Sequence, residues 1–413
     1  MVGTVHFSVA QRRARLAHRH RLLPGRATDD LAALAEDVVA LHSSDPATVY
    51  LSAWARMVHP SLAAVEAALY DQRIVIRHHA MRRTLWVTTP PIMRWMHATT
   101  TARYAAAQHT RVIGMLAGNG IDDAPGWLEA AKNEVVAALR SGGPMTARVL
   151  GQRVPSLAHP IRLAAGTPYE GMQSAHSRVL LQLGFEAALI RTRPVGSWIS
   201  GQYTWAAMDS WLPEGLVLEG LLDDDRGAAV EREAAAQLAR HWLHRFGPAT
   251  TVDLQWWAGW TGAMTKRALA DIGAVAVEMD GGPGWLAPDD SALDDSAPDD
   301  SALDGRPEPW LAVLPGLDPT TMGWKQREWY LPATAAAAFD SNGNAGPTIW
   351  LDGEVVAGWA QTKDGELRVH WFSEIPAVRR KQVQRRLNEL RDWLGPSRFT
   401  VRFPAPHQKQ LLA

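Results

Sequence analysis

The sequence predicts an α+β protein, mainly helical, in which one pattern occurs three times before a β-rich C-terminal domain. In each occurrence, helices with apolar residues at helical spacing are followed by two extended segments. From residue 309 onward the pattern of apolar residues changes, and short strand-like apolar runs dominate. Three helices followed by an extended pair is the order of a winged helix-turn-helix, so we expect three tandem winged-helix units.

The chain of 413 residues is long enough for about four units of roughly 100 residues each. We expect loops rather than long linkers between them. The expected units are winged helix 1 over 1–112, winged helix 2 over 113–225, winged helix 3 over 226–306 and the β-rich domain over 307–413.

Capping residues and a proline mark the expected helix ends in the first unit. Thr28 or Asp29 can cap a helix that should end before Pro46, because the residue preceding a proline is pushed out of helical geometry. Ser61 can cap a later helix. The expected helices are 9–22, 30–41, 50–57 and 62–70, and the expected extended segments are 74–77 and 84–88.

The second and third units repeat this order. Thr146, Thr250 or Thr251, and Thr261 are candidate helix caps. In the second unit we expect helices at 125–139, 146–151 and 173–183, and extended segments at 185–191 and 198–205. In the third unit we expect helices at 231–246, 252–257 and 264–271, and strands at 274–279 and 285–287.

The last unit carries a hairpin signal at Asp352-Gly353, because both residues tolerate the positive φ of a tight turn. A late amphipathic helix is expected over 379–394. The expected strands are 310–314, 348–351, 355–359, 367–372 and 399–403.

The net charge of −1 conceals an uneven distribution of charge along the chain. An Asp-Asp-Ser-Ala repeat at 289–304 holds seven Asp and no basic residue, so the remainder carries a net charge of +6. Such a tract cannot form a core, and we expect a disordered acidic insert over 288–305. The remaining positive charge is almost all Arg, which suits phosphate and favours nucleic acid as a partner. The Ala- and Gly-rich, Lys-poor composition explains the Arg excess equally well.

Composition excludes several classes of protein. Without cysteine, the chain has no disulfides, Fe–S clusters or thiolate zinc sites. Its His residues lack metal-site spacing, and no GxGxxG or Walker loop occurs, so we expect no metal and no nucleotide cofactor. No apolar run of about 18 residues and no secretory signal is found, which predicts a cytoplasmic protein without a membrane partner.

Seven groups of residues together resemble the winged-helix DNA glycosylase family, the AlkZ/YcaQ-like proteins. They are 41–46 with 50–51, 81–85, 202–212, 246–250, 260–262, 314–318 with Arg327, and 352–358. The resemblance covers nearly the whole chain. It implies a C-shaped, nucleoid-associated protein, expected to be a monomer, whose units line a basic channel for double-stranded DNA. The implied activity is excision of alkylated or cross-linked purines without a metal or cofactor.

Within this resemblance, the family's Gln-x-Gln or Gln-x-Asp motif falls on His42-Ser43-Ser44. Such an enzyme must stabilise an oxocarbenium-like sugar and position a water on its far face. In one interpretation His42 orients or deprotonates that water and Ser44 supplies a second hydrogen bond. In the other, the pair has lost this function and the protein binds or regulates DNA without excision. His42 can also simply favour a helix C-terminus.

The stretch 81–87 is the second candidate site. Arg82 and Thr84 match the family pattern and are expected to contact phosphate, whereas Arg83 stands where the family usually has Gly. Trp86 replaces the family's His and either stacks on DNA or belongs to the core. Arg327 either pairs with Asp318 or contacts DNA.

Overall fold

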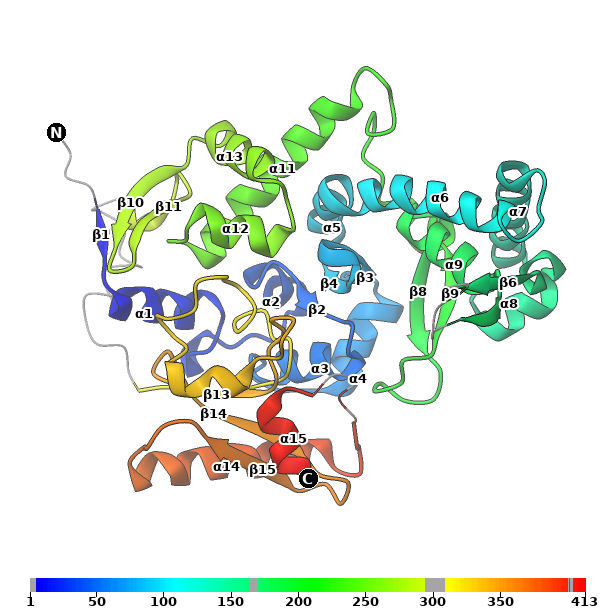
Figure 1. Ribbon diagram of the computed structural model, residues 1–413. Coiled ribbons are helices and arrows are strands. Elements are labelled where there is room, and N and C mark those ends of the chain that lie inside the picture. The colour runs from blue at the N-terminus through cyan, green and yellow to red at the C-terminus, as the bar shows by residue number, and fades with distance from the viewer. Residues whose placement is uncertain (1–4, 164–165, 167–169, 294–308, 400, 402–403) are drawn as a thin grey trace.

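The computed structural model describes residues 5–163, 166, 170–293, 309–399, 401 and 404–413. Figure 1 shows a body that combines the N-terminal elements, the third helical unit and the C-terminal sheet, with the second unit projecting on one side. The fold is mixed α+β, with small sheets in its helical part and a four-stranded antiparallel sheet near the C-terminus. This confirms the α+β class, although helices make up only about half of the chain.

The first unit brings three short strands together in the order β2-β4-β3. Its helices are α1 (Val9–Arg19), α2 (Leu31–Asp37), α3 (Pro46–Trp54) and α4 (Leu62–Glu66), and its strands are β2 (Leu41–His42), β3 (Ile76–His79) and β4 (Leu85–Thr88).

The helix expected to run to residue 41 ends earlier. Asp30 caps α2 by accepting hydrogen bonds from two backbone amides, and the helix stops at Asp37. Val39 has a φ of 62°, a left-handed conformation that a helix cannot continue through. Leu41 and His42 then pair with Val87 and Trp86, so the candidate motif begins on a strand.

The first and second units are joined by a long helical stretch that the sequence interpretation missed. It consists of α5 (Pro90–Met96), a π-helical segment (η4, His97–Thr101) and α6 (Ala102–Ala117). Residue 112, the expected boundary between the units, lies inside α6.

The second unit contains α7 (Ala124–Gly142), β5 (Met145–Thr146), α8 (Ala147–Arg153), β6 (Pro160–Leu163), β7 (Gly171–Ser174), α9 (His176–Phe185), β8 (Leu189–Pro194), β9 (Tyr203–Ala207) and α10 (Met208–Trp211). Its main sheet has the order β5-β9-β8. The predicted start of the next helix at residue 173 is wrong, because Gln173 belongs to β7 and pairs with Ile161 of β6.

The third unit comprises α11 (Gly227–Phe246), α12 (Thr251–Ala258), α13 (Gly262–Asp271), β10 (Val275–Met279) and β11 (Gly282–Leu286). The N-terminal strand β1 (His6–Phe7) pairs in parallel with β10 and completes its sheet.

Most of the acidic insert expected over 288–305 lies outside the described residues, from residue 294 onward. Its first two carboxylates belong to the fold, which corrects the expectation of an unpacked tract from residue 288. Asp290 is buried and accepts hydrogen bonds from Arg15 at 2.6 Å and Arg19 at 2.9 Å. Asp289 pairs with Arg240 and His244 on α11.

The C-terminal part contains the sheet β12-β13-β14-β15 and two helices. The elements are β12 (Leu311–Leu314), β13 (Thr348–Leu351), β14 (Glu354–Gln361), β15 (Leu367–Trp371), α14 (Ala377–Leu394) and α15 (Pro406–Leu412). Asp352 and Gly353 have φ of 52° and 90°, confirming the hairpin turn. The strand expected over 399–403 falls partly outside the described residues, and α15 was not anticipated.

Two large apolar clusters, and a small one around Phe7 and Val277, stabilise the described part of the chain. One continuous apolar cluster runs through the first unit, the third unit and the C-terminal sheet, from Leu16 to Leu394. The second unit has a further cluster of its own, from Val112 to Ala207. One face of its β8–β9 hairpin nevertheless belongs to the larger cluster, through Ile190, Ala206 and the following Met208. All four expected units therefore contribute to the larger interior, and only the second also has a large core of its own among the described residues.

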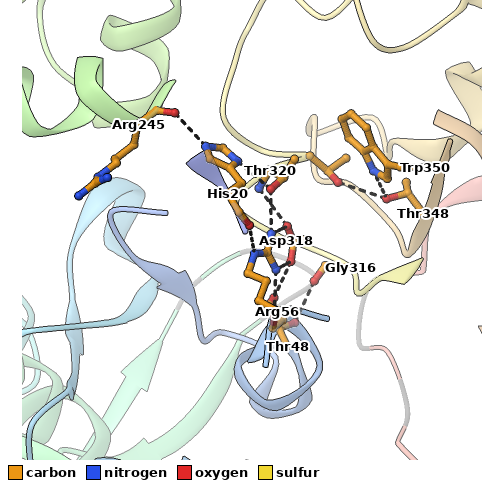
Figure 2. A network of polar contacts seen from close by, with 11 residues as sticks. His20, Thr48, Arg56, Arg245, Gly316, Asp318, Thr320, Thr348 and Trp350 are labelled. Carbon is orange, nitrogen blue, oxygen red and sulfur yellow. Dashed lines mark hydrogen bonds and ion pairs between the residues drawn. The ribbon is translucent and has the colours of Figure 1, made fainter. Parts of the chain in front are cut away.

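A buried ion pair connects the first unit to the C-terminal part (Figure 2). Arg56, just after α3, donates to both carboxylate oxygens of Asp318, at 2.9 and 2.7 Å, and neither side chain is exposed to solvent. Arg56 also donates to the carbonyl of His20, and Asp318 accepts from Ser52 Oγ. The expected pairing of Asp318 with Arg327 is therefore wrong.

Among the described residues, no helix combines the length and apolar character needed to cross a membrane. In the same residues, no group of three or more His, Asp or Glu side chains is arranged to hold a metal ion.

Replacing Arg56 with Met should lower the free energy of unfolding by about 3–5 kcal/mol, because Asp318 is left buried without its counter-ion. The matched control is Arg232→Met, which breaks the more exposed pair with Asp271 and should leave the free energy of unfolding nearly unchanged, because solvent screens that pair. Denaturant unfolding of both variants measures the difference. Equal losses of unfolding free energy in the two variants would show that the buried pair contributes no more to stability than the exposed pair.

Candidate active site

A cleft of about 600 Å³ lies where the first unit, the β8–β9 hairpin region and the C-terminal part meet. His42, Ser44 and Thr84 line it from the first unit, so three of the residues singled out in the sequence come together. Arg191 and Tyr203 line it from the second unit. The C-terminal part contributes 315–317, 344–347, Trp359, Phe399, Val401 and Gln408.

Strand pairing and a helix cap hold the 42–46 turn in place. His42 pairs with Trp86 across β2 and β4, and the next amide, of Ser43, donates to the carbonyl of Leu85 at 2.7 Å. Asp45 then caps α3 by accepting from the amide of Ala47 at 3.1 Å, and Pro46 occupies the first turn of that helix. The turn is thus fixed at both ends.

His42 is a buried, neutral imidazole. Its side chain lies in van der Waals range of the Trp86 ring, with centroids 4.6 Å apart, and only 4% of the residue is exposed. Burial, and secondarily the positive charge of Arg82, lower the pKa of His42 to about 3. Since Nδ1 accepts a hydrogen bond from the Ser44 amide at 3.3 Å, the ring proton resides on Nε2. His42 does not cap a helix, because it lies on β2.

Two features of this turn differ from the sequence interpretation. Ser44 is exposed at the cleft, and its Oγ accepts from the amide of Leu85 at 3.3 Å. Asp45, which the sequence analysis does not single out, also lines the cleft, and burial raises the pKa of its carboxyl group. The Asp-Pro pair signals a helix start but does not reveal that the capping carboxylate faces a cleft.

The second unit supplies two polar groups that the sequence interpretation missed as site residues. Arg191 Nε and the Tyr203 hydroxyl are both buried, and neither has a hydrogen-bond partner among the described residues. Arg77 lies behind Tyr203, with its guanidinium 4.6 Å from the centre of that ring. Alternation along β8 and β9 assigns side chains to a face of the hairpin, but not to a cleft formed with another unit.

Thr84 and Trp86 form a small polar contact beside His42. The indole Nε1 of Trp86 donates to Thr84 Oγ1 at 2.8 Å, and that hydroxyl donates to the carbonyl of Met81 at 2.8 Å. Trp86 is only 1% exposed, so it belongs to the core and presents no face for stacking on a base. Its role here is to support His42.

Aromatic rings of α12 and α6 lie beside the three arginines of the candidate site. The guanidinium groups of Arg82 and Arg327 lie 4.5 and 4.9 Å from the centre of the Trp256 ring. Burial and the nearby charge of Arg327 lower the pKa of Arg82. Arg83 is exposed and lies 5.6 Å from the Tyr104 ring. In the described part of the chain, none of these three arginines has a carboxylate within ion-pair distance, an arrangement suited to an anion.

Comparison with known proteins identifies the family. The family model described as "DNA glycosylase AlkZ-like" matches residues 35–393, which includes both the 42–46 turn and the arginines. The chain belongs to the AlkZ-like DNA glycosylase family. Among solved structures, Streptomyces sahachiroi DNA glycosylase AlkZ has a TM-score of 0.68 and 18% sequence identity, over 96% of this chain and 100% of that one. No curated protein matches.

In this AlkZ-like chain, the resemblance inferred from sequence is confirmed for the family and the fold. The structural match, at 18% identity, concerns the arrangement of the chain rather than its substrate.

The tautomer of His42 can be observed directly. Imidazole ¹⁵N–¹H NMR should show a neutral ring with the proton on Nε2 throughout pH 5–8, since the pKa lies near 3. His42→Asn, which removes the resonances, provides the assignment. A protonation step near pH 6.5 at this residue would contradict the buried, neutral ring.

The same shift predicts how His42 affects stability. Its folded-state pKa lies below the unfolded value of about 6.5, so its contribution is fully present above that pH and is lost as the pH falls toward 3. The loss from this one group approaches about 1.4 kcal/mol per pH unit. Comparing unfolding of wild type and His42→Asn at pH 7 and pH 5 measures it, with a smaller pH dependence expected in the variant.

Proposed function

We propose that this protein is a monofunctional DNA glycosylase that hydrolyses the N-glycosidic bond of alkylated purines during base excision repair. The observation that carries the proposal is the cleft containing His42, Ser44 and Thr84 in a chain that belongs to the AlkZ-like family. N7- and N3-alkylated purines, including bulky or cross-linked nucleotides in double-stranded DNA, are the proposed substrates. The proposed site of action is the nucleoid in the cytoplasm.

We also propose that the three helical units act as winged helices, divided near residues 112, 225 and 306 from each other and from the C-terminal part. Support comes from the sheet orders β2-β4-β3 and β5-β9-β8, in which the hairpin formed after the helices pairs with a strand that precedes two of them. This order of elements is typical of DNA-binding winged helices.

The reaction makes modest demands on the protein. An alkylated purine already carries positive charge, so the protein has to stabilise an oxocarbenium-like sugar and hold a water on its far face. In our proposal, His42 donates a hydrogen bond from Nε2, and the Ser44 hydroxyl provides the second contact. A neutral donor at position 42 orients a water rather than removing its proton.

The proposed DNA contacts lie beside the cleft. Arg82, Arg83 and Arg327 would bind backbone phosphates, and Thr84 would contact the strand at the cleft wall. The absence of carboxylate partners for these arginines in the described residues supports this role. Trp86 would act indirectly, by holding His42 and Thr84.

The alternative is a DNA-binding or regulatory protein without catalytic activity. It is favoured by the replacement of the family's glutamine by His42, a ring whose low pKa and occupied Nδ1 make it a poor base. The two functions differ in whether bound DNA loses a base.

Incubation with N7-methylguanine DNA and with a cross-linked duplex should produce alkali-labile abasic sites. His42→Ala should lower the single-turnover rate by about 10²-fold, while leaving DNA affinity nearly unchanged. DNA binding without abasic sites on either substrate would favour the alternative. No binding even at low salt would exclude both functions.

Arg82→Gln and Arg327→Gln should each weaken DNA binding and reduce the dependence of log Kd on log salt by about one. The control Arg232→Gln removes a charge on α11 that is already paired with Asp271, and should leave the salt dependence unchanged. Binding titrations at several salt concentrations measure both effects. An unchanged slope in both test variants would remove these arginines from the interface.

A further inference from the structure

We infer that Asp45 is the catalytic base of this site, the group that takes a proton from the water attacking the sugar. The inference rests on the proposed glycosylase function and deepens it. It concerns a carboxylate one position beyond the family motif, in a cleft where that motif itself has changed to His42 and Ser44.

The first argument is the inventory of the cleft. Among the described residues that line it, Asp45 is the sole carboxylate, and the other charged or titratable groups are His42, Arg191 and Tyr203. The lining residues of the C-terminal part are uncharged in the described chain. Any proton accepted from a water in this cleft must go to one of these side chains.

The alternatives are poor acceptors for physical reasons. His42 carries its proton on Nε2, and Nδ1 is occupied by the Ser44 amide. Arg191 is a cation with no lone pair to offer. Burial raises the pKa of the Tyr203 hydroxyl, which therefore stays protonated and acts as a donor. Asp45, the one carboxylate among these groups, is the remaining acceptor.

The second argument is the position of Asp45. Its Oδ1 accepts the Ala47 amide at 3.1 Å, which fixes the side chain at the start of α3. No donor in the described chain reaches Oδ2, and the residue is only partly exposed. Burial raises the pKa of the carboxyl group, which makes its ionised form a stronger base than an exposed aspartate.

A third, independent observation indicates that the cleft receives a polar ligand. Tyr203 lines the cleft and is 8% exposed, and its hydroxyl is buried without a hydrogen-bond partner among the described residues. A buried hydroxyl without a partner is costly, so a bound nucleotide or water would satisfy it. Asp45 also influences the pKa of Tyr203 through its charge, which puts the two groups in the same electrostatic environment.

In the inferred step, the bond from C1′ to N9 of the alkylated purine breaks and its electron pair goes to the base, neutralising the positive charge. The water oxygen forms the new bond to C1′ and its proton passes to Asp45. The products are a neutral free base, an abasic sugar, and a protonated carboxyl group that releases its proton to solvent. The step needs no further reactant.

Because Asp45 is a helix cap, its charge can be removed by a substitution that keeps the cap. Asparagine caps helices about as well as aspartate, so Asp45→Asn removes the charge while preserving α3. Asp123 offers a matched control, because it caps α7 by accepting the Gly126 amide and is exposed, outside the cleft. With N7-methylguanine DNA under single-turnover conditions, Asp45→Asn should slow excision about 10²–10⁴-fold, with DNA affinity and thermal unfolding nearly unchanged. Asp123→Asn should excise at the wild-type rate.

The pH profile separates a base from a structural residue. The wild-type rate should fall on the acid side as the Asp45 carboxylate becomes protonated, and the residual rate of Asp45→Asn should lack that limb. If wild type is active and Asp45→Asn is equally active, this inference is overturned while the proposed function stands. The same holds if Asp45→Asn is slow but its rate still falls on the acid side as in wild type. If Asp45→Asn unfolds, Asp45→Ser, another capping residue, is tested for rescue by formate, and absence of rescue overturns the inference. Wild type inactive on alkylated DNA overturns the proposed function and this inference with it.

Discussion

The ion pair between Arg56 and Asp318 is the constraint on which the cleft depends. Arg56 follows α3, whose first turn holds the 45–46 part of the cleft wall, and Asp318 follows the 315–317 segment that forms the opposite wall. A bidentate contact between fully buried groups fixes the two walls relative to each other. Thr48 reinforces the connection through its hydroxyl, which donates to the Gly316 carbonyl at 2.9 Å. Ionic contacts in the interior therefore determine the shape of the site.

Beside the cleft, unlike at the buried Arg56–Asp318 pair, arginine side chains are not neutralised by carboxylates of the described residues. Arg82 and Arg327 are close enough to affect each other, yet their neighbours are an indole ring and backbone carbonyls rather than carboxylates. Such partners orient a guanidinium group without neutralising it. The fold thus retains a local electrostatic penalty that a bound anion would relieve, while the nearby positive charge helps to keep His42 neutral.

Local signals in the sequence predicted much of the fold. Caps such as Thr146 and Thr261, and the turn at Asp352-Gly353, were read correctly because each acts within a few residues. The errors arose where contacts between residues far apart in the sequence determine the structure. Residues 41 and 42, expected at or after the end of a helix, instead pair with β4, and Asp318 pairs with a residue 262 positions away. The positions of His42 and Ser44 at a common site followed from the family resemblance, whereas Asp45, Arg191 and Tyr203 required the assembled cleft.

The two separate cores have a consequence for how the molecule opens. The outer helices of the second unit pack around an apolar interior of their own, whereas the turn with His42 and Asp45 lies beside the larger, shared one. Each core is expected to behave as a distinct cooperative unit in hydrogen exchange. The β8–β9 hairpin, which holds Arg191 and Tyr203, has one face in each core, because Ile190 and Ala206 belong to the larger cluster and Leu189 and Ala207 to the smaller one. Local opening of the second unit's own core is therefore expected to expose its outer helices to exchange while this wall of the cleft stays in place.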